Sequence, residues 1–167
     1  ANDVVYADRA SADARLLTYT SEPLTEDLEV TGTPVARIHV RSTTEDSAFF
    51  VYLEDIDPSG QVRYVTEGQL RALHRKVSPE TPPYKIFGPY HSFFSQDALP
   101  MKPGEVAEVE VEMHPTSVLF RKGHRVRLAI GGADKDTFAR IPEDETPQWT
   151  IERNRSRASE LELPVVR

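Results

Sequence analysis

The sequence predicts an all-β fold, either a sandwich or a barrel, and three observations support this. Apolar and polar residues alternate with the period of a strand in several segments. The 167 residues include 13 prolines and 8 glycines, which provide many turns. No long segment carries the apolar period of an amphipathic helix. Short strands separated by turns are typical of sandwiches and barrels.

Size and composition indicate one soluble domain over residues 1–167, with residues 1–14 as an N-terminal extension. A chain of this length buries about 70% of its unfolded surface, which is enough for a core. The net charge of −7 has the wrong sign for binding phosphate backbones, so we expect no nucleic-acid partner. No apolar run approaches the roughly 20 residues that span a bilayer, so we expect no membrane partner. Cysteine is absent, which excludes disulfides and thiolate chemistry. These features favour a cytoplasmic location and leave a secreted parent protein open.

Three segments predict strands with one buried face, because their apolar residues alternate with polar ones: residues 35–42, 109–114 and 124–130. Residues 49–53 are apolar throughout and predict a covered central strand. The inward side chains of these segments are the predicted core: Ala36, Ile38, Val40, Val51, Leu53, Val109, Val111, Val126, Leu128 and Ile130.

Turn residues connect these strands. Asp57-Pro58-Ser59-Gly60 has proline at the second and glycine at the fourth position of a type I turn, so residues 61–66 should form the hairpin partner. Residues 70–77 are expected to continue that strand after a bulge at Gly68. Arg121-Lys122-Gly123 predicts a tight turn before residues 124–130. Residues 8–15 and 156–161 could each form a short helical turn.

Residues 81–104 interrupt the strand pattern with five prolines and five aromatic residues. A loop this long inside a domain is usually functional or packed as a unit. Three interpretations stay open: packing onto the domain itself, an interface with another domain, and a sugar-stacking surface. The candidate interface or ligand-contact residues are Tyr84, Phe87, Tyr90, Phe93 and Phe94.

Catalytic and metal chemistry find little support in the residues. The pentapeptide G-x-S-x-G of the α/β-hydrolase nucleophile elbow does not occur, and we assign no catalytic residue. The segment from Asp55 to Gly60 copies the opening of a calcium loop, but the twelfth position is Thr66 where a glutamate would close it. A turn capped by aspartates is therefore favoured. Acidic residues at 134–136 and 143–145 predict a solvated loop, with a structural calcium as the alternative. No cofactor and no metal ligand are assigned.

Several tracts, in order along the chain, resemble one known family. They read L-T-Y-T-S-E-P-L-T-E-D-L-E-V-T-G-T-P at 17–34, V-T-E-G-Q-L-R-A-L-H-R at 65–75 and F-R-K-G-H-R-V-R-L-A-I at 120–130. They resemble the C-terminal domain of the cocaine-esterase and X-prolyl dipeptidyl-peptidase family of serine hydrolases. The resemblance implies a β-sandwich jelly roll of the galactose-binding-domain-like type. It also implies that the catalytic serine, acid and histidine lie upstream, in an α/β-hydrolase domain.

The resemblance predicts a non-catalytic accessory domain that braces the catalytic domain and shapes its substrate cleft. The expected partner is the α/β-hydrolase domain of the parent chain, and a homo-oligomer stays open. Residues 132–142 depart from the P-R-F-D-R-N-P-N-T-G tract of better-known members, so ester, amide and X-prolyl substrates all stay open for the parent. The alternative is a free-standing jelly-roll module that binds carbohydrate or another ligand. A G-x-S-x-G upstream in the full reading frame would discriminate between the two.

Overall fold

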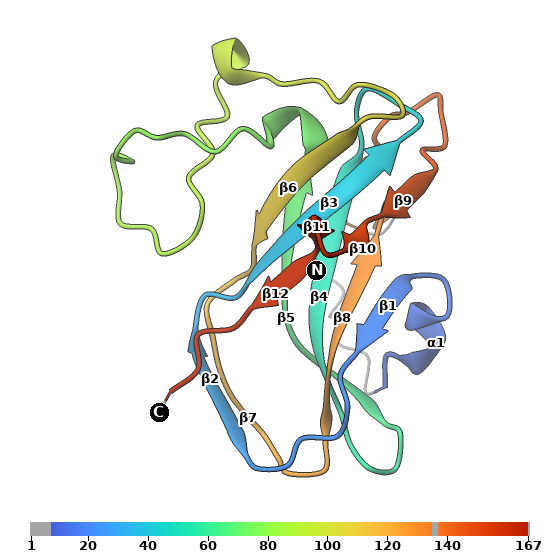
Figure 1. Ribbon diagram of the computed structural model, residues 1–167, viewed down its shortest axis with the longest axis vertical. Coiled ribbons are helices and arrows are strands. Elements are labelled where there is room, and N and C mark those ends of the chain that lie inside the picture. Colours follow the sequence, from blue (N-terminus) through green and yellow to red (C-terminus); the bar gives the residue numbers. More distant parts are fainter. Residues whose placement is uncertain (1–7, 135–136, 167) are drawn as a thin grey trace.

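The chain forms a sandwich of two antiparallel sheets in the computed structural model, which describes residues 8–134 and 137–166 (Figure 1). The first sheet has the strand order β1-β8-β4-β5. In the second sheet β3 pairs with β6 along one edge, and with β12 and then β9 along the other. This arrangement confirms the predicted all-β jelly-roll sandwich.

The strands of the first sheet are β1 (Leu17–Thr20), β4 (Ala48–Ile56), β5 (Val62–Arg71) and β8 (Arg125–Gly131). Those of the second are β3 (Val35–Ser42), β6 (Val106–Glu112), β9 (Trp149–Ile151) and β12 (Glu160–Glu162). Two further pairs are β2 (Leu28–Gly32) with β7 (Thr116–Phe120), and β10 (Arg153–Asn154) with β11 (Arg157–Ala158). Among the described residues, the helical elements are α1 (Ala10–Asp13) and two single 3-10 turns, η1 (Ala72–His74) and η2 (Ser95–Asp97).

The core lies between the two sheets, and all ten predicted core side chains are buried there. Alternation fixes which side of each strand faces inward, because successive side chains point to opposite faces of a sheet. β4 is buried along its whole length, which includes the apolar residues 49–53 that predicted a covered strand. Its outward residues Phe50 and Tyr52 form a second apolar cluster, against which Leu16 and Ile141 pack.

Local predictions had mixed outcomes at the hairpin between β4 and β5. The turn is present, with the Gly60 amide donating to the Asp57 carbonyl oxygen at 2.9 Å. The bulge lies at Val65, because Leu53 pairs with Thr66 while Glu54 pairs with Tyr64. The prediction of a bulge at Gly68 was therefore wrong. Gly68 pairs regularly with Val51, and its lack of a side chain admits the Glu112 carbonyl oxygen, which would lie 2.1 Å from a Cβ atom.

The two segments with a predicted helical turn differ in outcome. Residues 10–13 form α1, whereas residues 156–161 form β11 and the start of β12 because they pair with β10 and β3. Within the predicted extension 1–14, the structure describes Asp8 onward. Arg9 and Asp13 are buried there, so this part packs on the outer face of the first sheet.

Candidate functional site

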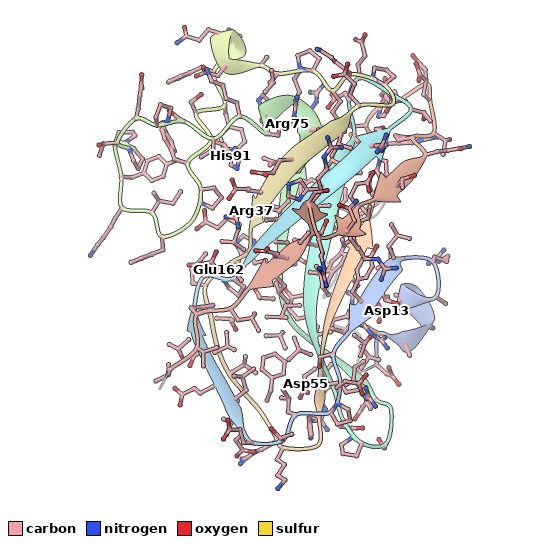
Figure 2. All side chains as sticks on the ribbon, in the orientation of Figure 1. Asp13, Arg37, Asp55, Arg75, His91 and Glu162 are labelled. Atoms are coloured by element: carbon pink, nitrogen blue, oxygen red, sulfur yellow. The ribbon has the colours of Figure 1, made fainter. Side chains whose placement is uncertain are left out.

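Much of the aromatic loop, residues 81–104, stands away from the sandwich (Figure 1, green to yellow), whereas its last part returns to the core, where Met101 is 1% exposed. It belongs to the connection that leads from β5 in the first sheet to β6 in the second. The η2 turn lies within it. Its position at one end of the sandwich leaves one side of the loop without contact to either sheet (Figure 2).

Polar contacts, with the buried His91 among them, hold the base of the aromatic loop. His91 is buried, and its Nδ1 and Nε2 atoms lie 3.2 Å from the Lys76 carbonyl oxygen and 3.0 Å from the Glu110 carbonyl oxygen. The Ser78 amide donates to the Tyr90 carbonyl oxygen at 2.8 Å. Lys76 forms an ion pair with Asp97, which also accepts a hydrogen bond from the Ser92 hydroxyl at 2.6 Å. The loop is therefore fixed to β6 and to the segment after η1.

The aromatic side chains of the loop are mostly exposed. Phe87 is 78% exposed, Phe94 59%, Phe93 58% and Tyr84 56%. Only Tyr90 is half-buried, with its ring edge-on to Tyr84 at a centroid distance of 6.0 Å. Tyr90 is thus the least exposed of the five rings, and the other four keep more than half of their surface in solvent. Phe93 also has a φ of 57°, an unfavourable backbone conformation for a bulky residue, and its ring lies 5.2 Å from that of His74.

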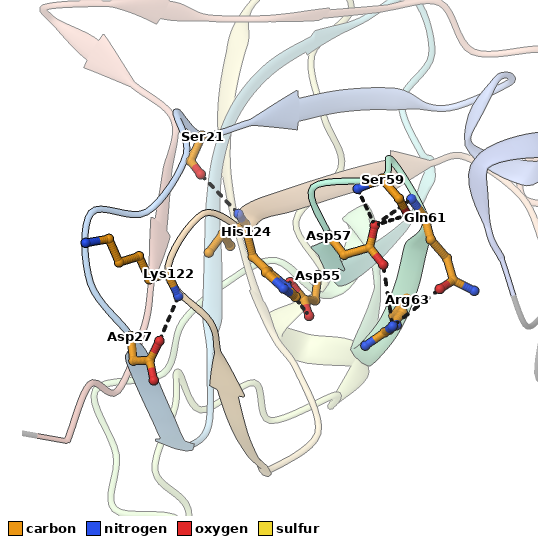
Figure 3. A network of polar contacts seen from close by, with 10 residues as sticks. Ser21, Asp27, Asp55, Asp57, Ser59, Gln61, Arg63, Lys122 and His124 are labelled. Atoms are coloured by element: carbon orange, nitrogen blue, oxygen red, sulfur yellow. Dashed lines mark hydrogen bonds and ion pairs between the residues drawn. The ribbon is translucent and has the colours of Figure 1, made fainter.

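A second polar cluster surrounds the turn between β4 and β5 (Figure 3). Both carboxylate oxygens of Asp55 contact His124 Nδ1, at 2.8 and 3.0 Å. Asp57 Oδ1 accepts hydrogen bonds from the Ser59 hydroxyl and from the amides of Ser59 and Gln61. The Ser59 hydroxyl bond is the main reason why the pKa of Asp57 is lowered. Asp57 therefore caps the turn, as the sequence analysis favoured.

The Asp55–His124 pair has the geometry that orients a catalytic base in serine hydrolases. The cluster contains two serines, Ser21 and Ser59 (Figure 3). The Ser59 hydroxyl donates to Asp57, and the Ser21 hydroxyl donates to the Glu22 carbonyl oxygen at 2.8 Å and accepts from the Val126 amide at 3.0 Å. Across residues 8–134 and 137–166, none of the hydrogen bonds joins a serine or threonine hydroxyl to a histidine ring. The cluster therefore holds the start of β8 beside the hairpin and does not form a triad.

A buried charge cluster that sequence reasoning missed lies on the outer face of β4. Arg9 Nε donates to Glu54 Oε1 at 2.6 Å, and Arg127 Nη1 donates to Asp13 Oδ2 at 3.0 Å. The Arg9 guanidinium also stacks 4.2 Å from the centre of the Tyr52 ring. One signal in the sequence could have indicated this cluster. Glu54 lies two residues after Tyr52, on the outward side of a strand that is covered on both faces, so its charge needs a partner. The cluster borders a cavity of about 1090 Å³.

The acidic loops give no metal site in the described part of the chain. No group of three or more histidine, aspartate or glutamate side chains there is arranged to hold an ion. Asp134 accepts a hydrogen bond from the Tyr52 hydroxyl at 3.3 Å, and Asp136 lies outside the described residues. No helix among the described residues is long and apolar enough to cross a membrane.

The comparison with protein families agrees with the geometry. The model of the X-Pro dipeptidyl-peptidase C-terminal non-catalytic domain matches residues 2–159. The chain belongs to this family. The family description, a non-catalytic C-terminal domain, fits the lack of a nucleophile elbow in the sequence and the engaged hydroxyl of Ser21.

Curated relatives of this X-Pro dipeptidyl-peptidase C-terminal domain are much longer proteins. Proteins of Mycobacterium bovis and Mycobacterium tuberculosis that carry the name serine esterase are each 52% identical over 163 residues, which is 98% of this chain and 26% of theirs. The cocaine esterase of Rhodococcus is 29% identical over 142 residues, or 80% of this chain and 21% of that protein. The chain thus spans about a quarter of the length of the relatives it matches.

Solved structures share the fold of the X-Pro dipeptidyl-peptidase C-terminal domain. An α-amino-acid ester hydrolase matches 98% of this chain and 28% of its own with a TM-score of 0.76, at 19% identity. A CocE/NonD family hydrolase from Staphylococcus aureus matches 95% and 32% with a TM-score of 0.71, at 21% identity. The family resemblance that the sequence motifs indicated is confirmed.

Proposed function

We propose that this non-catalytic domain braces the α/β-hydrolase domain of a longer parent chain, and that the aromatic loop is the contact surface. The observation that carries the proposal is the set of four aromatic rings held in solvent by a loop with a fixed base. The family supports the non-catalytic assignment, and the length of the relatives supports a larger parent protein.

The exposed rings are suited to an interface because they are costly to leave in water. Val77 and Leu99 are also exposed, at 41% and 43%, and they lie in sequence on either side of the four rings. Soluble monomers rarely expose contiguous apolar patches larger than a few hundred Å². Burial of an aromatic side chain removes a large apolar area from water, and aromatic residues dominate the energetics of many interfaces.

The fixed base of the loop favours tight binding by lowering the entropy cost of association. Side chains and loops that become ordered on binding weaken affinity, whereas a preorganised surface does not incur that cost. His91 and the Lys76–Asp97 ion pair already hold the loop. We infer that the loop keeps its shape when the catalytic domain docks, and that its exposed rings line part of the substrate cleft.

The test uses the α/β-hydrolase half of the parent, prepared separately and titrated with this chain by calorimetry. Phe87→Ala and Phe94→Ala should each weaken association by about 1–2 kcal/mol if the ring is an anchor. Leu119→Ala is the matched control, because Leu119 is 40% exposed on β7, away from the loop. The melting temperatures of all variants should stay close to that of the unsubstituted domain. If association is unchanged while the loop variants melt much lower, the loop supports the fold and is not an interface.

The cleft role has its own measurement. With the two halves mixed at saturating domain, Phe87→Ala should change KM for a bulky p-nitrophenyl ester more than for p-nitrophenyl acetate. Equal effects on both esters would show that the loop does not line the substrate cleft. The proposal that the domain braces the catalytic domain would then stand alone. A glycan array provides the remaining comparison: a specific sugar hit that Phe87→Ala and Phe94→Ala both lose would favour the free-standing carbohydrate-binding module.

A further inference from the structure

The sandwich is open along the edge where β1 and β8 face β12 and the β9–β10 segment. A slot of about 460 Å³ enters the space between the sheets there. On the neighbouring strand Val51 and Leu53 are 0% exposed, whereas Val126 and Leu128 on β8 keep 8% each because they border the slot. The slot is therefore an extension of the core that solvent can reach.

The walls of the slot are mostly apolar. Inward side chains of β8 form its floor, and residues from both sheets and their connections form its sides: Leu24, Leu28, Ile151, Leu161 and Leu163. The floor from Val126 to Ile130 extends about 13 Å at the usual rise of a strand. A volume of this size falls within the range of small-ligand pockets, which are mostly apolar with a few polar groups that fix orientation.

One cation on the rim has no anionic partner. The Arg153 guanidinium lies 5.3 Å from the centre of the Tyr19 ring, and in the described part of the chain it forms no ion pair or hydrogen bond through its side chain. Arg37, the other cation that lines the slot, is already engaged, because it donates to Glu110 at 3.1 Å and pairs with Glu160 at 3.7 Å. The hydroxyl of Ser159 is also engaged, because it donates to the Glu152 carbonyl oxygen at 2.7 Å. The rim therefore offers one positive charge to a ligand.

We propose that this slot binds a straight-chain monocarboxylic acid. The hydrocarbon chain lies along β8 between the sheets, and the carboxylate meets Arg153 at the rim. An elongated floor favours an unbranched chain, and guanidinium groups form strong charge-assisted hydrogen bonds with carboxylates. Arg37, Ser21 and Ser159 on the rim are already engaged, so a neutral head group finds few free partners there. This site is separate from the aromatic loop and does not depend on the function proposed above.

The test is titration of the chain with octanoate, followed by calorimetry and by NMR of the leucine, isoleucine and valine methyl groups. We expect saturable shifts at the Leu128, Leu161 and Leu163 methyls, with octan-1-ol binding about tenfold more weakly. Arg153→Gln should weaken octanoate binding about tenfold and leave octan-1-ol binding unchanged. Arg155→Gln is the matched control, because Arg155 is exposed in the turn between β10 and β11 and does not border the slot.

A second variant tests the slot apart from its charge. Leu161→Trp should fill the slot and abolish the methyl shifts that octanoate and octan-1-ol cause. If Leu161→Trp is unfolded at the temperature of the measurement, Ile151→Phe is used in its place. Octanoate binding that Arg153→Gln and Arg155→Gln weaken equally would overturn the carboxylate assignment. Methyl shifts that map outside the slot, or the absence of saturable binding, would overturn the site. Shifts at these methyls caused by the catalytic half, and left unchanged by octanoate, would assign the slot to an interdomain contact instead.

Discussion

Glu54 is the residue whose surroundings are least expected from its type. It is 0% exposed on a covered strand, and Arg9 donates a hydrogen bond to it from a segment 45 residues earlier. Burial, then hydrogen bonding to Asp13 and the charge of Asp13, raise the pKa of Glu54 from 4.5 to about 7 against the opposing effect of Arg9. Asp13 Oδ1 and Glu54 Oε2 are buried without another hydrogen-bond partner, and a proton on Glu54 allows them to bond to each other.

This raised pKa predicts a pH dependence of stability. Between pH 4.5 and about 7 the folded chain keeps a proton on Glu54 that the unfolded chain has released. The free energy of unfolding should therefore fall as pH rises through this interval, by on the order of 2 kcal/mol. Glu54→Gln should flatten the profile because the amide does not titrate. Urea unfolding from pH 5 to 8 measures this, with Glu162→Gln, an exposed glutamate on β12, as control. If the unsubstituted chain and Glu54→Gln lose stability equally as pH rises, the raised pKa of Glu54 is not the cause.

At the scale of the elements, the neighbouring strands β4 and β8 should differ in how much stability they lose when a core leucine is shortened to alanine. Leu53→Ala on β4 should cost about 2–5 kcal/mol, because its side chain is fully enclosed and its loss leaves a closed cavity. Leu128→Ala on β8 should cost about 1 kcal/mol less, since the space joins a slot that already admits solvent. Denaturant unfolding of both variants measures the difference. Equal losses would show that the slot closes in solution.

Alternation was sufficient to predict β3 and β8, because one face of each is buried and the other carries paired charges. Arg37 on β3, for example, meets Glu110 on β6, which is its direct cross-strand neighbour. The residues around Gly68 could not be predicted in the same way. Position 68 requires glycine because a side chain there would clash with the Glu112 carbonyl oxygen, which belongs to a strand of the other sheet. Contacts of this kind depend on how the sheets pack and leave no local pattern in the sequence.

The candidate site was predictable in composition but not in geometry. Five aromatic residues among prolines indicated an unusual loop, yet only the fold separates Tyr90 from the four exposed rings. His91 gave no signal that it holds the loop, because its two carbonyl partners lie 15 and 19 residues away. Arg153 and the slot were equally hidden, since the apolar walls come from six separate segments of the chain.

At the scale of the whole molecule, the chain should be catalytically silent by itself. It has no G-x-S-x-G elbow, and both serines near the Asp55–His124 pair are engaged, Ser21 by Glu22 and Val126 and Ser59 by Asp57. The isolated chain should neither hydrolyse p-nitrophenyl esters or X-prolyl amides nor react with a fluorophosphonate probe. The hydrolase half of the parent is the positive control. Stoichiometric labelling of one serine in this chain would contradict the accessory role.

The position of the aromatic loop between β5 and β6 has one more consequence, for how the domain can be divided. A cut in the loop after Ile86 places β1 to β5 in one piece and β6 to β12 in the other. The pairs β1–β8, β4–β8, β2–β7, β3–β6, β3–β9 and β3–β12 all join the two pieces. Each half alone leaves β3 or β8 without its neighbours, whereas together they complete both sheets. The two halves, produced as separate polypeptides, should therefore be unfolded alone and should reassemble on mixing into a complementing pair with the circular dichroism spectrum of the intact chain.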